Sequence, residues 1–236
     1  MPSAPAPSRS PAPPRTARGS QAREKLKKAA LRVLDREGYH RMRIVDVTRE
    51  AGVAQGLFYH YFSDLKSLTL EVLEDFVRVA DDVATIEKDV PKGDWYQRIY
   101  AHNLLVVRSY SRHPGVMRCL MQMADEDAGF SGLLRDSFRE RLMWLVNLLP
   151  RLFPEVTFPP QQGLMVVYAL AGGTEMLREY FIQRSASLRR AALSEEQLAE
   201  LLSVMFYRAL FLKHPPEQQL SYTRNLAAMV AKPKRR

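Results

Sequence analysis

The sequence offers little that would tie it to an oxidising compartment or to a membrane. It has one cysteine, Cys119, which excludes a disulfide within the chain. Valine, leucine and methionine residues surround Cys119, a setting that favours a small buried hydrophobe over a redox sensor. No apolar run reaches about 18 residues, and no apolar signal-like segment follows the basic amino end. We therefore expect a soluble, cytoplasmic protein without membrane binding.

Signals for metal or enzyme chemistry are also scarce. No two histidines stand at ligand spacing; they are His40, His60, His102, His113 and His214. We expect no metal site and no cofactor. A phosphate-binding glycine loop and a nucleophile elbow are absent. The adjacent glycines Gly172 and Gly173 fall inside a predicted helix and do not follow a strand, as a phosphate-binding loop would. Only His102 with Glu175 could be imagined as an acid and a base, so an enzyme that converts a small molecule is a weak alternative.

What is present favours helices and a polyanionic partner. The chain is 46% hydrophobic with 11 glycines, and strand-like alternation never exceeds a few residues. Residues 1–66 hold 13 Lys and Arg against 6 Asp and Glu, a net charge of +7, whereas residues 67–231 carry −2 and residues 232–236 carry +4. Basic charge gathered in this way is suited to counterion release from nucleic acid.

Helical patterns separated by proline- and glycine-containing breaks predict an all-α fold with two domains. We assign 1–19 to a disordered basic arm, 20–66 to a helix-turn-helix domain of three helices, 67–231 to a helical ligand-binding and dimerisation domain, and 232–236 to a basic tail. The expected helices are 20–37, two short helices of the helix-turn-helix, a capped helix from about 65 to 86, 94–112, 116–123, 130–149, 160–183, 194–212 and 217–230. Ser194 and Gln197 form a predicted capping box.

Residues 46–61 show the pattern of a helix-turn-helix that reads DNA. Val47 and Ala51 share one helical face, Gly52 ends that helix, and Phe58 and Phe62 are the anchors that attach the second helix to a core. We expect the remaining large uncharged side chains to face outward; they are Gln55, Leu57, Tyr59, His60 and Tyr61. The alternative is a small three-helix core without a ligand.

Residues 26–68 resemble the DNA-binding domain of the tetracycline-repressor (TetR) family of bacterial transcription regulators. The matching positions, at fixed spacing, are Ala29, Ala30, Leu34, Glu37-Gly38-Tyr39, Ile44, Asp46, Val47, Ala51-Gly52-Val53, Gly56, Tyr59, Tyr61-Phe62 and Leu68. Three departures from the family pattern occur. Met42 and Arg43 replace the usual Ser or Thr cap, Ala54 replaces another, and Leu65 takes the place of a lysine, with the charge moved to Lys66.

A helix in the major groove presents its first turns to base edges, which suggests a role for each exposed side chain. Gln55 can pair with adenine and Leu57 can pack on a thymine methyl group. The resemblance implies that Tyr59 and Tyr61 donate to phosphates, and His60 could do either. The predicted DNA contacts are Arg43, Gln55, Gly56, Leu57, Tyr59, His60, Tyr61 and Lys66, with screened charge from Arg49 and the Lys25–Lys28 cluster.

One such helix is too small an interface for regulation, so we expect a homodimer on a pseudo-palindromic operator in double-stranded DNA. The two helices nearest the carboxyl end are apolar over more than one stripe, as expected for a dimer surface, and the resemblance implies the same. The predicted interface residues are Leu164, Tyr168, Leu198, Leu202, Met205 and Phe206.

The resemblance also implies a small-molecule effector, which we expect to be apolar or amphipathic. Polar residues on apolar helical faces, with aromatic and methionine neighbours, are the candidates for its site. They are Trp95, His102, Asn103, Met121, Phe138, Arg141, Trp144, Tyr168 and Glu175. The predicted function is a repressor that its effector releases from DNA; a constitutive DNA-binding protein without effector is the nearest alternative.

Overall fold

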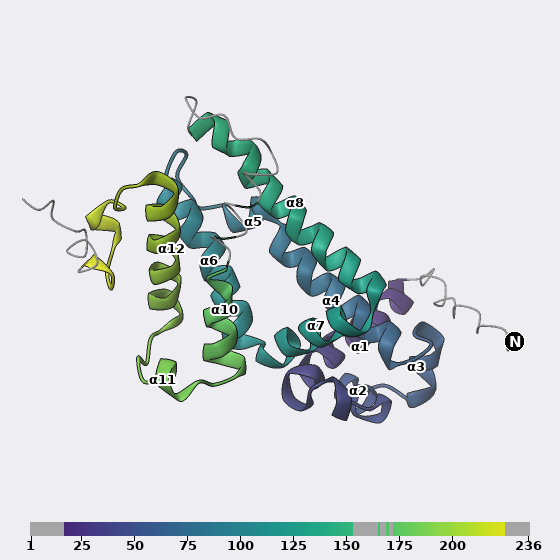
Figure 1. Ribbon diagram of the computed structural model, residues 1–236. Helices are drawn as coiled ribbons and strands as arrows, with labels where there is room; N and C mark the ends of the chain where they lie inside the picture. The colour runs from purple at the N-terminus through teal and green to yellow at the C-terminus, as the bar shows by residue number, and fades with distance from the viewer. Residues whose placement is uncertain (1–16, 153–164, 166–168, 170–171, 225–236) are drawn as a thin grey trace, which may run out of the picture. The chain divides into compact units, whose positions relative to one another are not determined.

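The computed structural model describes residues 17–152, 165, 169 and 172–224 (Figure 1). These residues form helices and contain no strand, which confirms the predicted all-α fold. The helices are α1 (Ala17–Glu37), η1 (Tyr39–Arg41), α2 (Ile44–Ala51), α3 (Gln55–Tyr61), α4 (Leu65–Asp81), α5 (Val83–Ile86), α6 (Trp95–Arg112), α7 (Pro114–Glu126), α8 (Ala128–Leu152), α10 (Thr174–Leu177), the π-helical η2 (Arg178–Ile182), α11 (Ala186–Arg189), α12 (Glu195–Phe211) and η3 (Glu217–Gln219). The predicted basic arm and tail lie outside the described residues, apart from the last residues of the arm, which belong to α1.

Two compact units divide the chain. The first holds α1 to α4 as far as Val79 together with Gly115–Arg135, and the second holds Ala80–Pro114 and the described residues from Asp136 onward. The predicted division after residue 66 differs from this one. Most of α4 and nearly all of α7 belong with the helix-turn-helix, because their apolar faces share its core.

The first unit has a core built from α1, α2, α3, α4, α7 and the start of α8. In α1 the apolar side chains recur at helical spacing along one face, as predicted. The buried members include Leu26, Ala29, Ala30, Val33, Leu34, Val47, Phe58, Phe62, Leu68, Leu73, Val116, Cys119, Met123 and Phe130. Burial of one of the larger side chains contributes about 1.5–3 kcal/mol. Burial also raises the pKa of the Cys119 thiol to about 12, which agrees with the predicted buried hydrophobe.

The fourth helix begins where expected and ends earlier. The carboxylate of Asp64 caps it by accepting from the N–H of Ser67 at 2.7 Å. The predicted continuation to residue 86 is wrong, because Asp82 starts the separate α5 by accepting from the N–H of Thr85 at 3.1 Å. Val79, in the last turn of α4, is 65% exposed.

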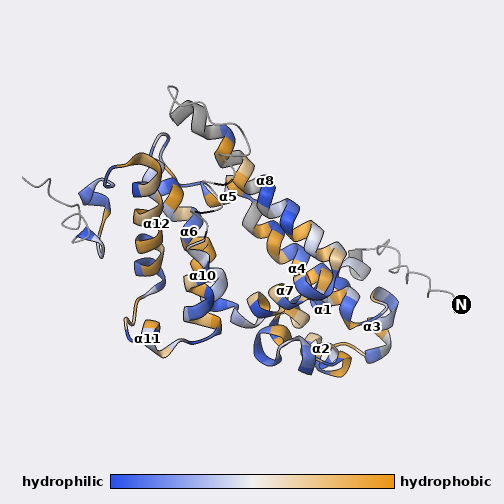
Figure 2. Ribbon diagram, in the orientation of Figure 1, coloured by the Kyte–Doolittle hydropathy of each residue, from blue (hydrophilic) through white to orange (hydrophobic). Residues whose placement is uncertain are grey.

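The second unit is built around α6 and α12, which pack along each other (Figure 1). Figure 2 shows that apolar residues cover much of α12. Its core contains Tyr96 from α6 with Val204 and Tyr207 from α12. The predicted capping box at the start of α12 is present, with both Ser194–Gln197 hydrogen bonds formed.

The segment after α12 is not the predicted helix. Over the described part of 217–230 it makes one 3₁₀ turn, and the backbone then bends around the buried carboxylate of Glu200. That carboxylate accepts from the N–H groups of Ser221, Tyr222 and Thr223 at 2.6–3.1 Å and from the Thr223 hydroxyl at 2.6 Å. These N–H groups therefore bond to a side chain and are unavailable for helical bonds. Of the predicted helix at 160–183, most residues before 172 lie outside the described chain.

Candidate nucleic-acid interface

A tight turn sets the relation between α2 and α3. Gly52 has the left-handed backbone conformation, with φ of 67°, that favours glycine at the end of a helix. Its N–H donates to the carbonyl of Arg49 at 3.1 Å, and the N–H of Val53 donates to the carbonyl of Thr48 at 3.0 Å. These bonds close α2, so α3 begins three residues later in a fixed direction.

The two faces of α3 differ in the way that a reading helix requires. Phe58, in α3, and Phe62, which follows it, are 0% and 2% exposed and lie in the core of the first unit, which confirms them as its anchors. Gln55 and His60 are exposed, and the Tyr59 side chain is 56% exposed. The helix thus carries hydrogen-bonding groups outward on a firmly packed base.

Two side chains predicted to face outward are placed differently. Tyr61 is 8% exposed and belongs to the core, so its predicted outward position is wrong. It follows Phe58 by three residues, and side chains three apart lie on the same side of a helix. Leu57 is half-buried and packs against the same core, which leaves only part of it available to a partner.

The starts of the two helices lack side-chain caps, as their sequence departures predicted. Neither Arg43 before α2 nor Ala54 before α3 forms a capping hydrogen bond, an absence worth about 1 kcal/mol each. Gly56, on the first turn of α3, is exposed, and a Cβ built there would meet nothing within 4 Å. No packing within the described chain therefore requires glycine at this position.

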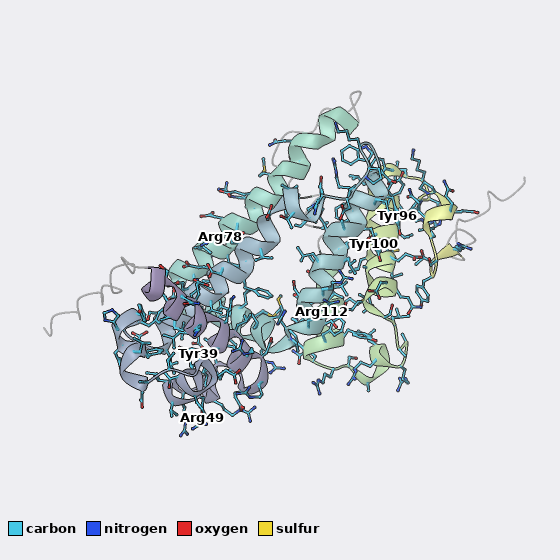
Figure 3. All side chains as sticks on the ribbon, turned by 180° about the vertical axis from the view of Figure 1, so that it is seen from behind. Tyr39, Arg49, Arg78, Tyr96, Tyr100 and Arg112 are labelled. Atoms are coloured by element: carbon cyan, nitrogen blue, oxygen red, sulfur yellow. The ribbon has the colours of Figure 1, made fainter. Side chains whose placement is uncertain are left out.

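Many cations of the first unit are already paired with carboxylates of the same unit. Arg32 bonds to Glu50 at 2.7 Å, and Arg49, marked in Figure 3, lies 3.4 Å from Asp46. By contrast Arg43 is exposed and makes no ion pair with any residue that the structure describes. Of the predicted phosphate contacts, Arg43 is thus the cation most available to an outside anion.

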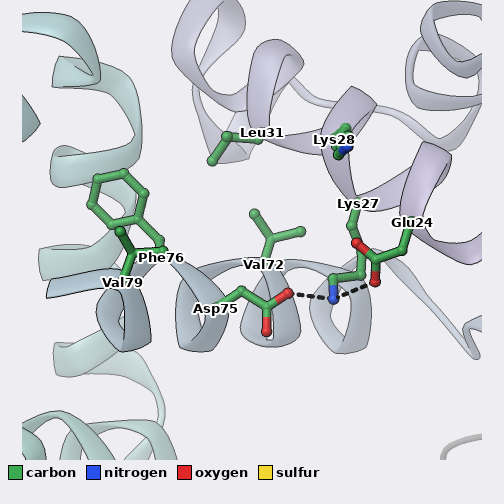
Figure 4. Close-up of a pocket in the computed structure, with 8 residues that line it drawn as sticks. All are labelled: Glu24, Lys27, Lys28, Leu31, Val72, Asp75, Phe76 and Val79. Atoms are coloured by element: carbon green, nitrogen blue, oxygen red, sulfur yellow. Dashed lines mark hydrogen bonds and ion pairs between the residues drawn. The ribbon is translucent and has the colours of Figure 1, made fainter. Parts of the chain in front are cut away.

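Lys27 cannot join the predicted lysine cluster. It lies in a groove of about 190 Å³ between α1 and α4, where its ammonium is held between Glu24 and Asp75 (Figure 4). A third carboxylate oxygen, Oε1 of Glu71, lies 3.3 Å from the ammonium nitrogen of Lys27. Burial alone would lower the pKa of Lys27, but the carboxylates of Asp75 and Glu24 outweigh this and raise it. Lys27 therefore stays protonated, and its charge is used in ion pairs within the protein.

Lys66 is also paired. Its ammonium lies 2.7 Å from Oδ2 of Asp127, the residue that precedes α8. The hydrogen bond between them raises the pKa of Lys66 and lowers the pKa of Asp127. Sequence reasoning missed Asp127, because no local spacing links two residues 61 positions apart. The only available signal was an aspartate at a helix start.

The comparisons with known proteins agree with this geometry. Residues 26–72 match the family model described as bacterial regulatory proteins, tetR family. This stretch of the chain is therefore a TetR-family DNA-binding domain by sequence. The chain is 35% identical over 77 residues to the HTH-type transcriptional regulator BetI of Vibrio atlanticus, a match that covers 32% of this chain and 38% of that protein. The match therefore spans about two fifths of the length of that relative.

Solved structures share the fold over a longer stretch. The tetR-family transcriptional regulator from Streptomyces coelicolor superposes with a TM-score of 0.60 at 22% identity, covering 81% of each chain. The fatty acid degradation regulator FadR from Bacillus halodurans gives a TM-score of 0.57 at 16% identity, over 82% of this chain and 97% of that one. At these identities the likeness establishes the TetR-family fold alone.

The polar residues predicted to bind an effector have partners inside the second unit. Nε2 of His102 lies 2.9 Å from Oε1 of Glu87, and the amide of Asn103 donates to the hydroxyl of Ser203 at 3.0 Å. Trp95 packs against the core around Tyr96 and Tyr207; Tyr96 is marked in Figure 3. These contacts fit satisfied core residues, and a ligand role for them stays a prediction.

The other predicted ligand residues do not gather with these. Glu175 is exposed and bonds to Arg178, so its predicted place on an apolar face is wrong. Met121 is in α7 and belongs to the first unit. Tyr168 and the side chains of Phe138, Arg141 and Trp144 lie outside the described residues.

A cavity of about 500 Å³ does occur in the second unit, among residues that the sequence did not single out. Its lining combines aromatic and cationic side chains; the residues are Ser111, Pro114, Tyr180, Phe181, Arg184, Arg189, Ala192 and Leu193. Arg184 has a left-handed backbone, with φ of 54°, directly after the π-helical η2. Such conformations are costly for a non-glycine residue and concentrate at functional sites.

The predicted dimer residues divide by burial. Leu198 is 1% exposed in the chain's own core and cannot meet a second subunit directly, so that prediction is wrong. Met205 is 59% exposed, and Leu202 and Phe206 are half-buried. Leu164 and Tyr168 lie outside the described residues.

Two negative findings apply to the described residues. They contain no group of three His, Cys, Asp or Glu side chains placed to hold a metal ion. None of their helices combines the length and the apolar character needed to cross a membrane.

Proposed function

We propose that this protein is a sequence-specific DNA-binding transcription regulator. The observation that carries the proposal is α3, which presents exposed Gln55, Tyr59 and His60 on a base fixed by Phe58 and Phe62. Uncharged hydrogen-bonding side chains held rigidly on a short helix suit the major groove, where base edges offer distinct donors and acceptors. The TetR-family match of residues 26–72 and the named activity of the BetI relatives support the same function.

Each exposed residue has a proposed part. Gln55 pairs with adenine, and the outer edge of Leu57 packs on a thymine methyl group. Tyr59 and Arg43 bind phosphates and fix the register without reading sequence, and His60, which is exposed on the same helix as Tyr59, can do either. Gly56 lets the duplex backbone approach the first turn of α3, which would explain a glycine that packing does not require.

Selection of bound duplexes from random DNA tests this function. We expect wild-type protein to enrich a pseudo-palindromic sequence, and Gln55→Ala or Leu57→Ala to change the base preferred at one position of each half-site. Tyr59→Phe should weaken binding to all sequences alike. Gln183→Ala, an exposed glutamine of the second unit, is the matched control and should change nothing. Equal binding of selected and random DNA at moderate salt would refute sequence-specific reading.

A homodimer is part of the proposal, because one short helix buries too little surface for a regulator. The exposed apolar face of α12 supports it: Leu202, Met205 and Phe206 follow at helical spacing, and Leu212 just beyond the helix is 90% exposed. A dimer would supply one α3 helix to each of two half-sites about 34 Å apart.

Control by an apolar or amphipathic small molecule is the finer part of the proposal. The aromatic and arginine-lined cavity in the second unit supports it, because its volume is in the range of small-molecule sites and its two arginines suit an acidic group. An effector acts only if it binds one arrangement of the dimer better than the other. The alternative is a constitutive regulator in which the cavity has no ligand.

A titration distinguishes effector control from constitutive DNA binding. Decanoate, with decanol as the uncharged match, would be added to the complex with selected DNA. We expect decanoate to release DNA from wild-type protein and to have little effect on an Arg184→Ala, Arg189→Ala double variant, whereas decanol should act weakly on both. If neither compound releases DNA, the result would favour constitutive DNA binding or an effector of different chemistry.

A further inference from the structure

The ion pair between Lys66 and Asp127 joins the first turn of α4 to the start of α8. Nζ of Lys66 lies 2.7 Å from Oδ2 of Asp127. The other carboxylate oxygen, Oδ1, accepts from the N–H of Phe130 at 2.8 Å and so caps α8. Both oxygens of Asp127 are therefore engaged, and the helix that the residue caps fixes its position.

The two partners differ in how freely they can leave the pair. The Lys66 side chain is 50% exposed, on a long flexible stem with three donors, whereas the Asp127 side chain is 21% exposed. Lys66 can swing to an outside anion by rotating its own side chain. Asp127 cannot follow without breaking the cap of α8.

We propose that Asp127 competes with DNA phosphate for Lys66, so that an internal carboxylate limits the affinity of the protein for DNA of any sequence. This inference rests on the proposed function and extends it, because it also requires that Lys66, a DNA contact predicted from the sequence, binds a phosphate. In the free protein Lys66 is already neutralised, so its move to a phosphate exchanges one anionic partner for another. The exchange also leaves the Asp127 carboxylate unpaired beside a polyanion.

The competition affects affinity and leaves sequence preference unchanged, because phosphates are the same at every base pair. A lysine without an internal partner gains a full new ion pair on DNA, whereas Lys66 gains only the difference between two pairs. Partly exposed pairs of this kind are weak, so the limit set by Asp127 amounts to roughly two- to five-fold in affinity.

Binding to a random-sequence 30-base-pair duplex, followed by fluorescence anisotropy over a range of KCl, tests the proposal. The variants are Lys66→Gln, Asp127→Asn and the two combined. Asp127→Asn should tighten binding about two- to five-fold when Lys66 is present. When Lys66 is absent it should have no more effect than Asp125→Asn, which removes an exposed carboxylate from α7 and serves as the matched control.

The salt dependence gives a second readout. In the Asp127→Asn background, loss of Lys66 should reduce the slope of log affinity against log salt by about 0.9, the value for one phosphate contact. In the wild-type background the reduction should be smaller, because Asp127 takes up a counterion when Lys66 departs.

Several results would overturn the inference. They are an unchanged or weaker affinity for Asp127→Asn, or the same gain with and without Lys66. Asparagine keeps the oxygen that caps α8, and Asp127→Ser, with a hydroxyl cap and no charge, repeats the test if Asp127→Asn is poorly folded. A wild-type protein that binds no DNA at low salt would contradict the proposed function itself, a result distinct from all of these.

Discussion

The backbone of Gly115 lies directly against the backbone of Asp35, so that a Cβ built at position 115 would stand 2.6 Å from the Cα of Asp35. The carboxylate of Asp35 also accepts from the N–H of Val116 at 3.1 Å. α7 therefore starts in contact with the backbone of α1, and a side chain at this point would force the two helices apart.

Gly115→Ala should destabilise the first unit by about 3 kcal/mol, because the methyl group would overlap backbone atoms that cannot rotate away. Urea unfolding followed by circular dichroism measures the change. The matched control is Gly132→Ala in α8, where a Cβ meets nothing within 4 Å. Alanine there should be neutral or stabilise by up to about 1 kcal/mol, since it is the better helix former. Equal stabilities for the two variants would argue against this close crossing.

The position of Gly115 illustrates what the sequence could and could not predict. The periodic apolar residues of α1, the glycine turn after α2 and the anchors Phe58 and Phe62 were predictable, because each depends on neighbours a few residues away. Gly115 was predictable only as part of a helix break. Its contact with Asp35 depends on tertiary packing across 80 positions, and no local pattern encodes that.

The candidate interface divides in the same way. Exposure of Gln55, Tyr59 and His60 followed from helical spacing, whereas the burial of Tyr61 did not. A helix of seven residues makes fewer than two full turns, so the boundary between its faces depends on how it is rotated against the core. The partner of Lys66 was equally out of reach, since Asp127 is brought to it by α7.

Tyr59→Ala and Tyr61→Ala should separate DNA contact from packing. Tyr61 is 8% exposed and belongs to the core, so its loss should lower the free energy of unfolding by about 3 kcal/mol. Tyr59 is 56% exposed, and its loss should change stability by less than about 0.5 kcal/mol while weakening binding to random-sequence DNA. The measurements are urea unfolding and anisotropy on the same samples. A large loss of stability for Tyr59→Ala would mean that its ring packs more than its exposure indicates.

Glu200 should make the stability of the second unit sensitive to acid. Burial would raise the pKa of its carboxyl, but hydrogen bonds from Thr223, Ser221 and Tyr222 outweigh this and lower the pKa below the ordinary 4.5. A lowered pKa in the folded state stabilises the protein above the unfolded pKa, and this stabilisation is lost as the pH falls through the folded value. The loss should therefore occur below about pH 4.5.

At neutral pH, Glu200→Gln should lower the free energy of unfolding by about 2 kcal/mol and so lower the urea midpoint. The reason is that the amide replaces one acceptor oxygen of the cluster with a donor. Below pH 4.5 the wild type should lose stability faster than this variant, so the two urea midpoints should converge. Glu217→Gln, at an exposed position with no carboxylate-to-backbone cluster, is the control and should follow the wild type at every pH. Parallel curves for wild type and Glu200→Gln would exclude this carboxylate as the source of the acid response.

Met205→Glu should separate the proposed dimer into monomers. Met205 is 59% exposed near the middle of the apolar face of α12, and a carboxylate there would be buried opposite its symmetry mate in a two-fold interface. Light scattering after size exclusion measures the mass, and we expect one chain of 27.1 kDa for the variant against two for the wild type. Leu188→Glu, a partly exposed apolar position on α11, should stay dimeric.

Because a monomer loses the second half-site, the binding of Met205→Glu to selected DNA should fall more than tenfold, while its binding to random DNA should change little. A Met205→Glu protein that remains a dimer would place the interface elsewhere on the second unit.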